Sequence, residues 1–161
     1  MIKEKELSEA RGQIRFKNGD GVTTVVLRQA LQQQATENGV PVSFDYDTVK
    51  MGGLLGGSTV DCLTIRNPEH MRDYWFFVVR VTHQGKYAFV NVDMAGTSKQ
   101  HGKEAAAQDA KALFSAGNLN SYGKGAMIGS ALRSIGKSKA KLEEEDNWYN
   151  MVNDIFDDLD L

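Results

Sequence analysis

Carboxylate and imidazole side chains, the kinds that perform general acid–base catalysis, occur in the middle of the chain. Asp45 and Asp47 alternate with apolar residues, so an extended backbone would place both carboxylates on one face, with Cβ atoms roughly 7 Å apart. Asp61 is a candidate cross-strand neighbour, and His70 and His83 supply imidazoles. These residues allow a small enzyme that uses a cleft between a sheet and a helix. The same alternation describes a solvated strand face and favours that simpler interpretation.

Motifs for phosphate, metal or nucleophilic chemistry are incomplete. Gly136-Lys137-Ser138 ends like a phosphate-binding loop, but Ala131 stands where that motif requires its first glycine. The histidines and Cys62 show neither C-x-x-C nor H-x-x-x-H spacing, which would bring two metal ligands together locally. Cys62 lies in an alternating apolar segment, which is typical of a small buried thiol. The sequence therefore predicts no metal and no cofactor, and no catalytic residue outside the acid–base hypothesis.

Charge is separated into blocks in the last third of the chain. Residues 110–142 carry six basic side chains and no acidic one, whereas residues 143–161 carry eight acidic side chains and no basic one. Lys124, Arg133 and Lys137 are therefore candidate binding residues for an anionic partner, a nucleic acid or a membrane surface. The acidic block can neutralise the basic segment 111–141 within the chain, and the pI near 5.9 argues against a nucleic acid.

A glycine-flanked loop is the most distinctive short segment. Leu54 and Leu55 stand between two Gly-Gly pairs in the segment Gly52–Gly57. Binding residues are often carried on loops, so the two leucines are candidate binding residues at a loop tip. Leucine is also among the residues most often buried, so the loop equally fits a wide hairpin whose leucines fold back onto the core.

The middle of the chain has the patterns expected of strands. Val42, Phe44 and Tyr46 form the apolar side of an alternating segment, which predicts that all three face the core. The segment from Tyr74 to Val81 is almost wholly apolar, as in a central strand. Gly85 can supply the tight turn that joins it to the next strand. Four strands are predicted in an antiparallel meander, at residues 42–47, 60–65, 74–81 and 87–92.

Helical patterns occur on both sides of these strands. A helix is predicted over Val22–Asn38, ended by Gly39 and Pro41. An alanine-rich helix is predicted over 102–116, and another over 143–161, where the acids on the face opposite the apolar stripe are expected to stay solvated. The predicted core-facing stripe of the first helix is Val22, Val25, Val26, Ala30 and Leu31, and that of the last is Trp148, Val152, Ile155, Phe156 and Leu159.

Together these patterns predict an α+β fold, a four-stranded antiparallel meander sheet preceded by one helix and followed by C-terminal helices. The 161 residues suit a single domain, 1–161. Its expected parts are an N-terminal arm at 1–20 with a strand-compatible segment at 13–17, an α+β core at 21–116, a glycine-rich basic connector at 117–137 and an amphipathic acidic helix at 138–161. No apolar run approaches the roughly 20 residues of a membrane span. One cysteine and a charged N-terminus without an apolar region favour a cytoplasmic protein.

The absence of a complete catalytic signature favours an interaction domain or a small-ligand-binding domain. Its partner would be an unidentified protein or small ligand. The amphipathic last helix also allows a homodimer that forms through this helix. The acid–base enzyme and the anionic-partner binder remain the alternative hypotheses.

Overall fold

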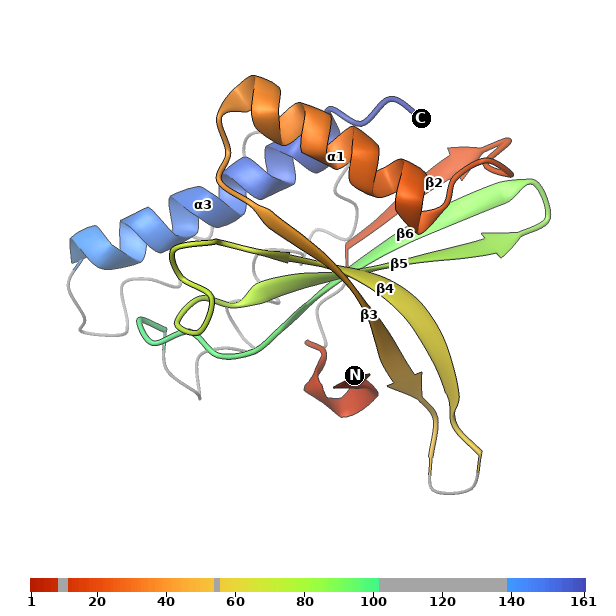
Figure 1. The fold of residues 1–161 in the computed structure, drawn as a ribbon, viewed down its shortest axis with the longest axis horizontal. Coiled ribbons are helices and arrows are strands. Elements are labelled where there is room, and N and C mark those ends of the chain that lie inside the picture. The colour runs from red at the N-terminus through yellow and green to blue at the C-terminus, as the bar shows by residue number, and fades with distance from the viewer. Residues whose placement is uncertain (9–11, 54–55, 102–138) are drawn as a thin grey trace.

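The structure is a computed structural model of the chain, and it describes residues 1–8, 12–53, 56–101 and 139–161. Within these ranges, strands and helices form an α+β fold with a twisted sheet and two α-helices (Figure 1). The predicted helix at 102–116, the connector at 117–137 and the tip of the glycine-flanked loop lie outside the described residues. The elements are β1 (Ile2–Lys3), the 3₁₀ turn η1 (Glu4–Glu6), β2 (Gly12–Lys17), α1 (Thr24–Asn38), β3 (Ser43–Met51), β4 (Ser58–Arg66), β5 (Phe76–Gln84), β6 (Tyr87–Ala95) and α3 (Lys139–Asp157).

The sheet of the described residues is six-stranded and mixed, with the order β1-β3-β4-β5-β6-β2. The predicted antiparallel meander is present as β3-β4-β5-β6, and its last turn has Gly85 at a φ of 59°, a left-handed conformation that favours glycine. The predicted strand count was too low, because β2 adds to β6 in antiparallel fashion and β1 adds to β3 in parallel. The first residues therefore form sheet edges rather than a free arm.

Helix α1 begins and ends at marked residues. The Thr23 hydroxyl accepts a hydrogen bond from the Val26 amide at 3.2 Å, and Gly39 closes the helix at a φ of 67°. Its core stripe differs from the predicted one: Val25 and Val26 are exposed, and the buried stripe is Leu27, Leu31 and Ala35. Spacings of four residues place this second set over the sheet.

Helix α3 supplies the largest side chains of the core. Trp148, Val152, Ile155 and Phe156 are buried as predicted, and Leu159 packs against the same core while half-buried. This apolar face is covered within the chain, so a homodimer through α3 would have to use another face. The prediction that the acids opposite the apolar stripe stay solvated was wrong for Asp146, and Glu145, which lies on the stripe, is also buried.

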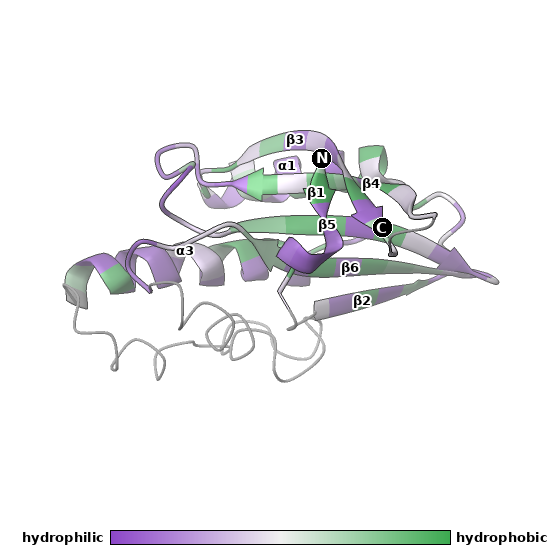
Figure 2. Cartoon of the chain, turned by 90° about the horizontal axis from the view of Figure 1, so that it is seen from below, coloured by the Kyte–Doolittle hydropathy of each residue, from purple (hydrophilic) through white to green (hydrophobic). Residues whose placement is uncertain are grey.

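The two faces of the sheet differ in what they bury. The helix-covered face carries the main core, and Figure 2 shows the apolar colour concentrated along β5 and β6. The opposite face carries a smaller cluster that includes Val49, Cys62 and Val78, beside a buried ion pair of Arg80 Nη2 and Asp93 Oδ2 at 2.6 Å. Burial raises the pKa of the Cys62 thiol to about 11, in agreement with a structural thiol. None of the helices in the described ranges is both long enough and apolar enough to cross a membrane.

Substitution of Phe77 on β5 tests how much the packing of α3 against the sheet contributes to stability. Its ring is fully buried and lies 5.7 Å from Trp148 and 6.4 Å from Phe156, between ring centroids. We expect Phe77→Ala to lower the free energy of unfolding by about 3–5 kcal/mol, because the cavity would lie under the helix. Urea unfolding measures the loss. Phe89→Ala, on the other face and half-buried, should cost clearly less, and equal losses would contradict this packing.

Candidate functional site

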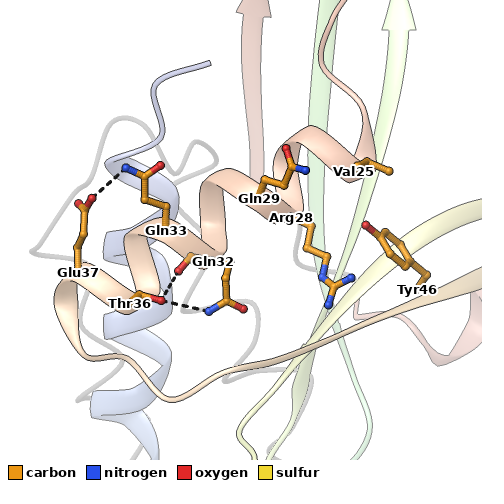
Figure 3. Close-up of a pocket in the computed structure, with 8 residues that line it drawn as sticks. All are labelled: Val25, Arg28, Gln29, Gln32, Gln33, Thr36, Glu37 and Tyr46. Carbon is orange, nitrogen blue, oxygen red and sulfur yellow. Dashed lines mark hydrogen bonds between the residues drawn. The ribbon is translucent and has the colours of Figure 1, made fainter.

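A groove lies between the exposed side of α1 and the edge strand β3. It has a volume of about 810 Å³ and is lined by one helix and one tyrosine. Figure 3 shows Arg28 extending from α1 toward Tyr46 on β3. We call it the α1–β3 groove, and its lining residues are Val25, Arg28, Gln29, Gln32, Gln33, Thr36, Glu37 and Tyr46.

Sequence spacing explains why these side chains line a groove. Val25, Arg28, Gln32 and Thr36 follow one another at three- or four-residue steps, so they share the side of α1 next to the buried stripe. Tyr46 lies opposite Leu63 in the register, on the helix-covered face. α1 does not extend over it, so Tyr46 is 50% exposed rather than part of the core as predicted.

An arginine and a tyrosine form the most distinctive contact of the groove. The Arg28 guanidinium carbon lies 5.1 Å from the centroid of the Tyr46 ring, a cation–π distance. No acidic side chain of the described residues pairs with Arg28. Glu37, at the other end of the groove, accepts a hydrogen bond from Gln33 Nε2 at 3.0 Å. The groove therefore offers a cation on an aromatic ring, and amides that can donate and accept.

A second group of polar side chains is buried where α3 meets the segment after β6. Glu145 Oε2 accepts hydrogen bonds from the Ser98 hydroxyl at 2.6 Å and from the Tyr149 hydroxyl at 2.7 Å. His101 Nε2 lies 3.1 Å from Asp146 Oδ1 and 3.4 Å from Glu145 Oε2. All five side chains are buried. We call them the buried polar cluster.

The electrostatics of this cluster follow from its burial. Desolvation raises the pKa of Glu145, although the hydrogen bonds from Ser98 and Tyr149 oppose the rise. Glu145 Oε1 has no hydrogen-bond partner among the described residues. The Tyr149 hydroxyl also accepts from the Trp75 amide at 3.0 Å, so the cluster joins α3 to the start of β5.

The buried polar cluster contains residue types that are common in catalytic sites. Its burial, however, leaves no surface on which a substrate could meet them. A general base must reach a substrate atom, and these side chains are buried and bonded to one another. Nor do the described residues contain a group of three or more His, Cys, Asp or Glu side chains placed to hold a metal ion. We therefore assign the cluster to holding α3 on the sheet.

The acid–base residues considered from the sequence are not brought together. Asp45 and Asp47 share the face of β3 opposite the helices, as expected, but Asp61 pairs with Thr48 and so lies on the other face. His70 Nδ1 lies 3.1 Å from Asp73 Oδ2, and its ring stacks on Tyr74 before β5.

His83 and Asp47 each have a hydrogen-bond partner outside the set of acid–base candidates. His83 lies near the end of β5, where its Nε2 is 3.2 Å from the Gly19 carbonyl, whereas His70 precedes the start of that strand. Asp47 accepts from the Thr48 amide at 2.7 Å, and that hydrogen bond lowers the pKa of Asp47. Neither histidine bonds to Asp45 or Asp47 in the part of the chain that the structure describes.

The other sequence candidates lie in undescribed parts of the chain. They are Leu54, Leu55, Lys124, Arg133 and Lys137.

Sequence reasoning missed both sites found here. For the cluster a signal existed, because Glu145 lies three and four residues before Trp148 and Tyr149, on the apolar stripe of α3. For the groove the signal was weaker. The run Gln32-Gln33-Gln34 marks a polar helix side, but nothing in the sequence shows that α1 stops short of Tyr46.

Compared with protein-family models, curated proteins and solved structures, the chain matches none of them.

Glu145→Gln tests the electrostatics of the buried cluster. A raised pKa means that the native state holds the proton more tightly than the unfolded chain. The stability contributed by Glu145 is therefore present below its ordinary pKa of 4.5 and is lost as the pH rises through the native pKa. Glutamine carries no charge to desolvate. We expect the unfolding free energy of Glu145→Gln, relative to wild type, to rise between pH 5 and pH 8 in urea titrations.

Glu144→Gln is the matched control, because Glu144 is the exposed neighbour on the same helix. Its difference from wild type should change little between the two pH values. A pH-independent difference for Glu145→Gln would contradict a buried carboxylate with a raised pKa.

Proposed function

We propose that this chain is a non-catalytic polypeptide-binding domain and that the α1–β3 groove is its binding site. The observation that carries this proposal is the Arg28–Tyr46 pair, a cation that has no anionic partner within the described ranges and lies on a half-exposed ring. Arginine and tyrosine are enriched among the residues that contribute most to protein interfaces.

The shape of the groove favours a polypeptide over a small molecule. Small-molecule sites are concave and bury most of the ligand surface. This groove has a helix on one side and Tyr46 on the other, and its lining side chains are mostly exposed. The exposed Val25 beside Tyr46 adds apolar contact area, and the glutamines suit backbone amides.

The chemistry of the groove favours binding over catalysis. Glu37 is its one carboxylate, it is bonded to Gln33, and the lining contains no histidine, cysteine or serine. A general acid–base pair is therefore missing from the surface where a substrate would enter.

Selection of peptides from a random display library on the full chain tests the proposal. We expect selected peptides to lose at least about tenfold in affinity on Tyr46→Ala, equivalent to about 1.4 kcal/mol, because the ring is the main contact surface. Isothermal titration calorimetry measures the change.

The matched control is Tyr87→Ala, since Tyr87 is also exposed and also lies under an arginine, with the Arg15 guanidinium carbon 5.7 Å from its ring centroid. That variant should bind as wild type does. A selection that yields no peptide sensitive to Tyr46→Ala would reject the proposal.

A further inference from the structure

The outer edge of β3 is unpaired along its first half. β1 is only two residues long and pairs with Val49 and Lys50. No strand of the described residues pairs on that side with Ser43–Asp47. This open edge borders the α1–β3 groove, because Tyr46 belongs to both.

Three hydrogen bonds show which peptide groups point to the open edge. The Thr48 amide donates to its neighbour Asp47 Oδ1 at 2.7 Å, and the Gly52 amide donates to Glu4 Oε2 on the η1 side at 3.0 Å. In contrast, the Asp45 carbonyl accepts from Thr64 Oγ1 on β4 at 3.3 Å. Peptide groups alternate in direction along a strand, so the N–H and C=O groups of Phe44 and Tyr46 point outward.

Charges on the two sides of this edge have opposite signs. On the helix side, Arg28 has no anionic partner among the described residues. On the other side, Asp45 is exposed and Asp47 pairs with the Met1 amino group at 3.1 Å. A strand placed beside β3 would alternate its side chains between these two environments.

We infer that the partner is an extended polypeptide segment that adds a strand to the sheet along Ser43–Asp47, with a carboxylate side chain toward Arg28 and a basic side chain toward Asp45. This inference rests on the proposed function and specifies its binding mode. Main-chain hydrogen bonds to Phe44 and Tyr46 supply affinity, and the alternating charges select the sequence and its register. The side chains on the helix side fill the α1–β3 groove.

A second copy of the chain is a poorer occupant of the same edge. Antiparallel pairing of β3 with another β3 would bring the exposed carboxylate of Asp45 and the half-buried carboxylate of Asp47 close to those of the other copy. Like charges facing each other across strands are destabilising. Charged side chains on an edge strand are a common means of preventing such self-association.

Hydrogen exchange and backbone methylation test strand addition. The probe is a synthetic copy of the tightest display peptide that is sensitive to Tyr46→Ala. At saturation we expect exchange of the Phe44 and Tyr46 amides, measured by NMR, to slow at least about tenfold, because each gains a main-chain acceptor. N-methylation at every second peptide residue should weaken binding at least about tenfold. N-methylation at the intervening peptide residues should leave the binding affinity nearly unchanged.

A pair of arginine variants tests whether Arg28 contacts a carboxylate side chain of the bound peptide. Arg28→Gln should weaken the same peptide about fivefold, with the loss shrinking in high salt, whereas Arg15→Gln should not. Equal effects of the two substitutions would overturn the assigned carboxylate contact.

The outcomes separate this inference from the proposed function. If binding stays sensitive to Tyr46→Ala but the Phe44 and Tyr46 amides gain no protection and the methylation scan is flat, strand addition is wrong and groove binding stands. If no peptide binding depends on Tyr46, the proposed function fails as well. A free chain that sediments as a dimer and becomes a monomer on Tyr46→Ala would overturn the partner, because a second copy would then occupy the edge.

Discussion

The docking of α3 onto the sheet is the interaction on which the other features depend. One helical turn carries Glu145 and Tyr149 into the interior beside Trp148, so aromatic rings and a carboxylate are buried together. Burying a carboxylate is costly unless it is hydrogen-bonded, and here Ser98 and Tyr149 both donate to it. The same tyrosine hydroxyl accepts from the Trp75 amide, which fixes α3 relative to β5.

This packing determines what remains uncovered. α3 and the buried stripe of α1 share one core on one face of the sheet. The sheet extends past α1 at β3, where Tyr46 lies in the groove with Val25 and Arg28 and stays half-exposed. On the same edge, β1 pairs only with Val49 and Lys50. The groove and the open edge are therefore two aspects of one feature, the incomplete covering of β3.

Much of the central fold was predictable from local signals. Strand alternation and Gly85 correctly indicated the β3-β4-β5-β6 meander, and Gly39 marked the end of α1. β1 was missed because two residues carry no recognisable period, and its pairing with Val49 is set by tertiary contacts. The stripe of α1 was assigned correctly at Leu31 but not at Val25 and Val26, which are apolar yet exposed, and only the position of the sheet distinguishes them from Leu27.

The candidate sites depended even more on contacts distant in sequence. Arg28 and Tyr46 are 18 positions apart (46 − 28), and His101 and Glu145 are 44 apart (145 − 101), so no local motif could reveal either pair. Glu145 could have been suspected from its place on an apolar stripe. Its partners Ser98 and His101 could not, because their segment has no periodic pattern to place it beside α3.

The open edge of β3 in the free chain is the central structural claim, and amide hydrogen exchange along residues 43–48 by NMR tests it directly. If the edge is open, exchange alternates: the outward amides of Phe44 and Tyr46 exchange rapidly, and the amides of Asp45 and Asp47, which face β4, exchange slowly. Uniformly slow exchange at all four residues would contradict the account, because the outer side of β3 would then already be paired.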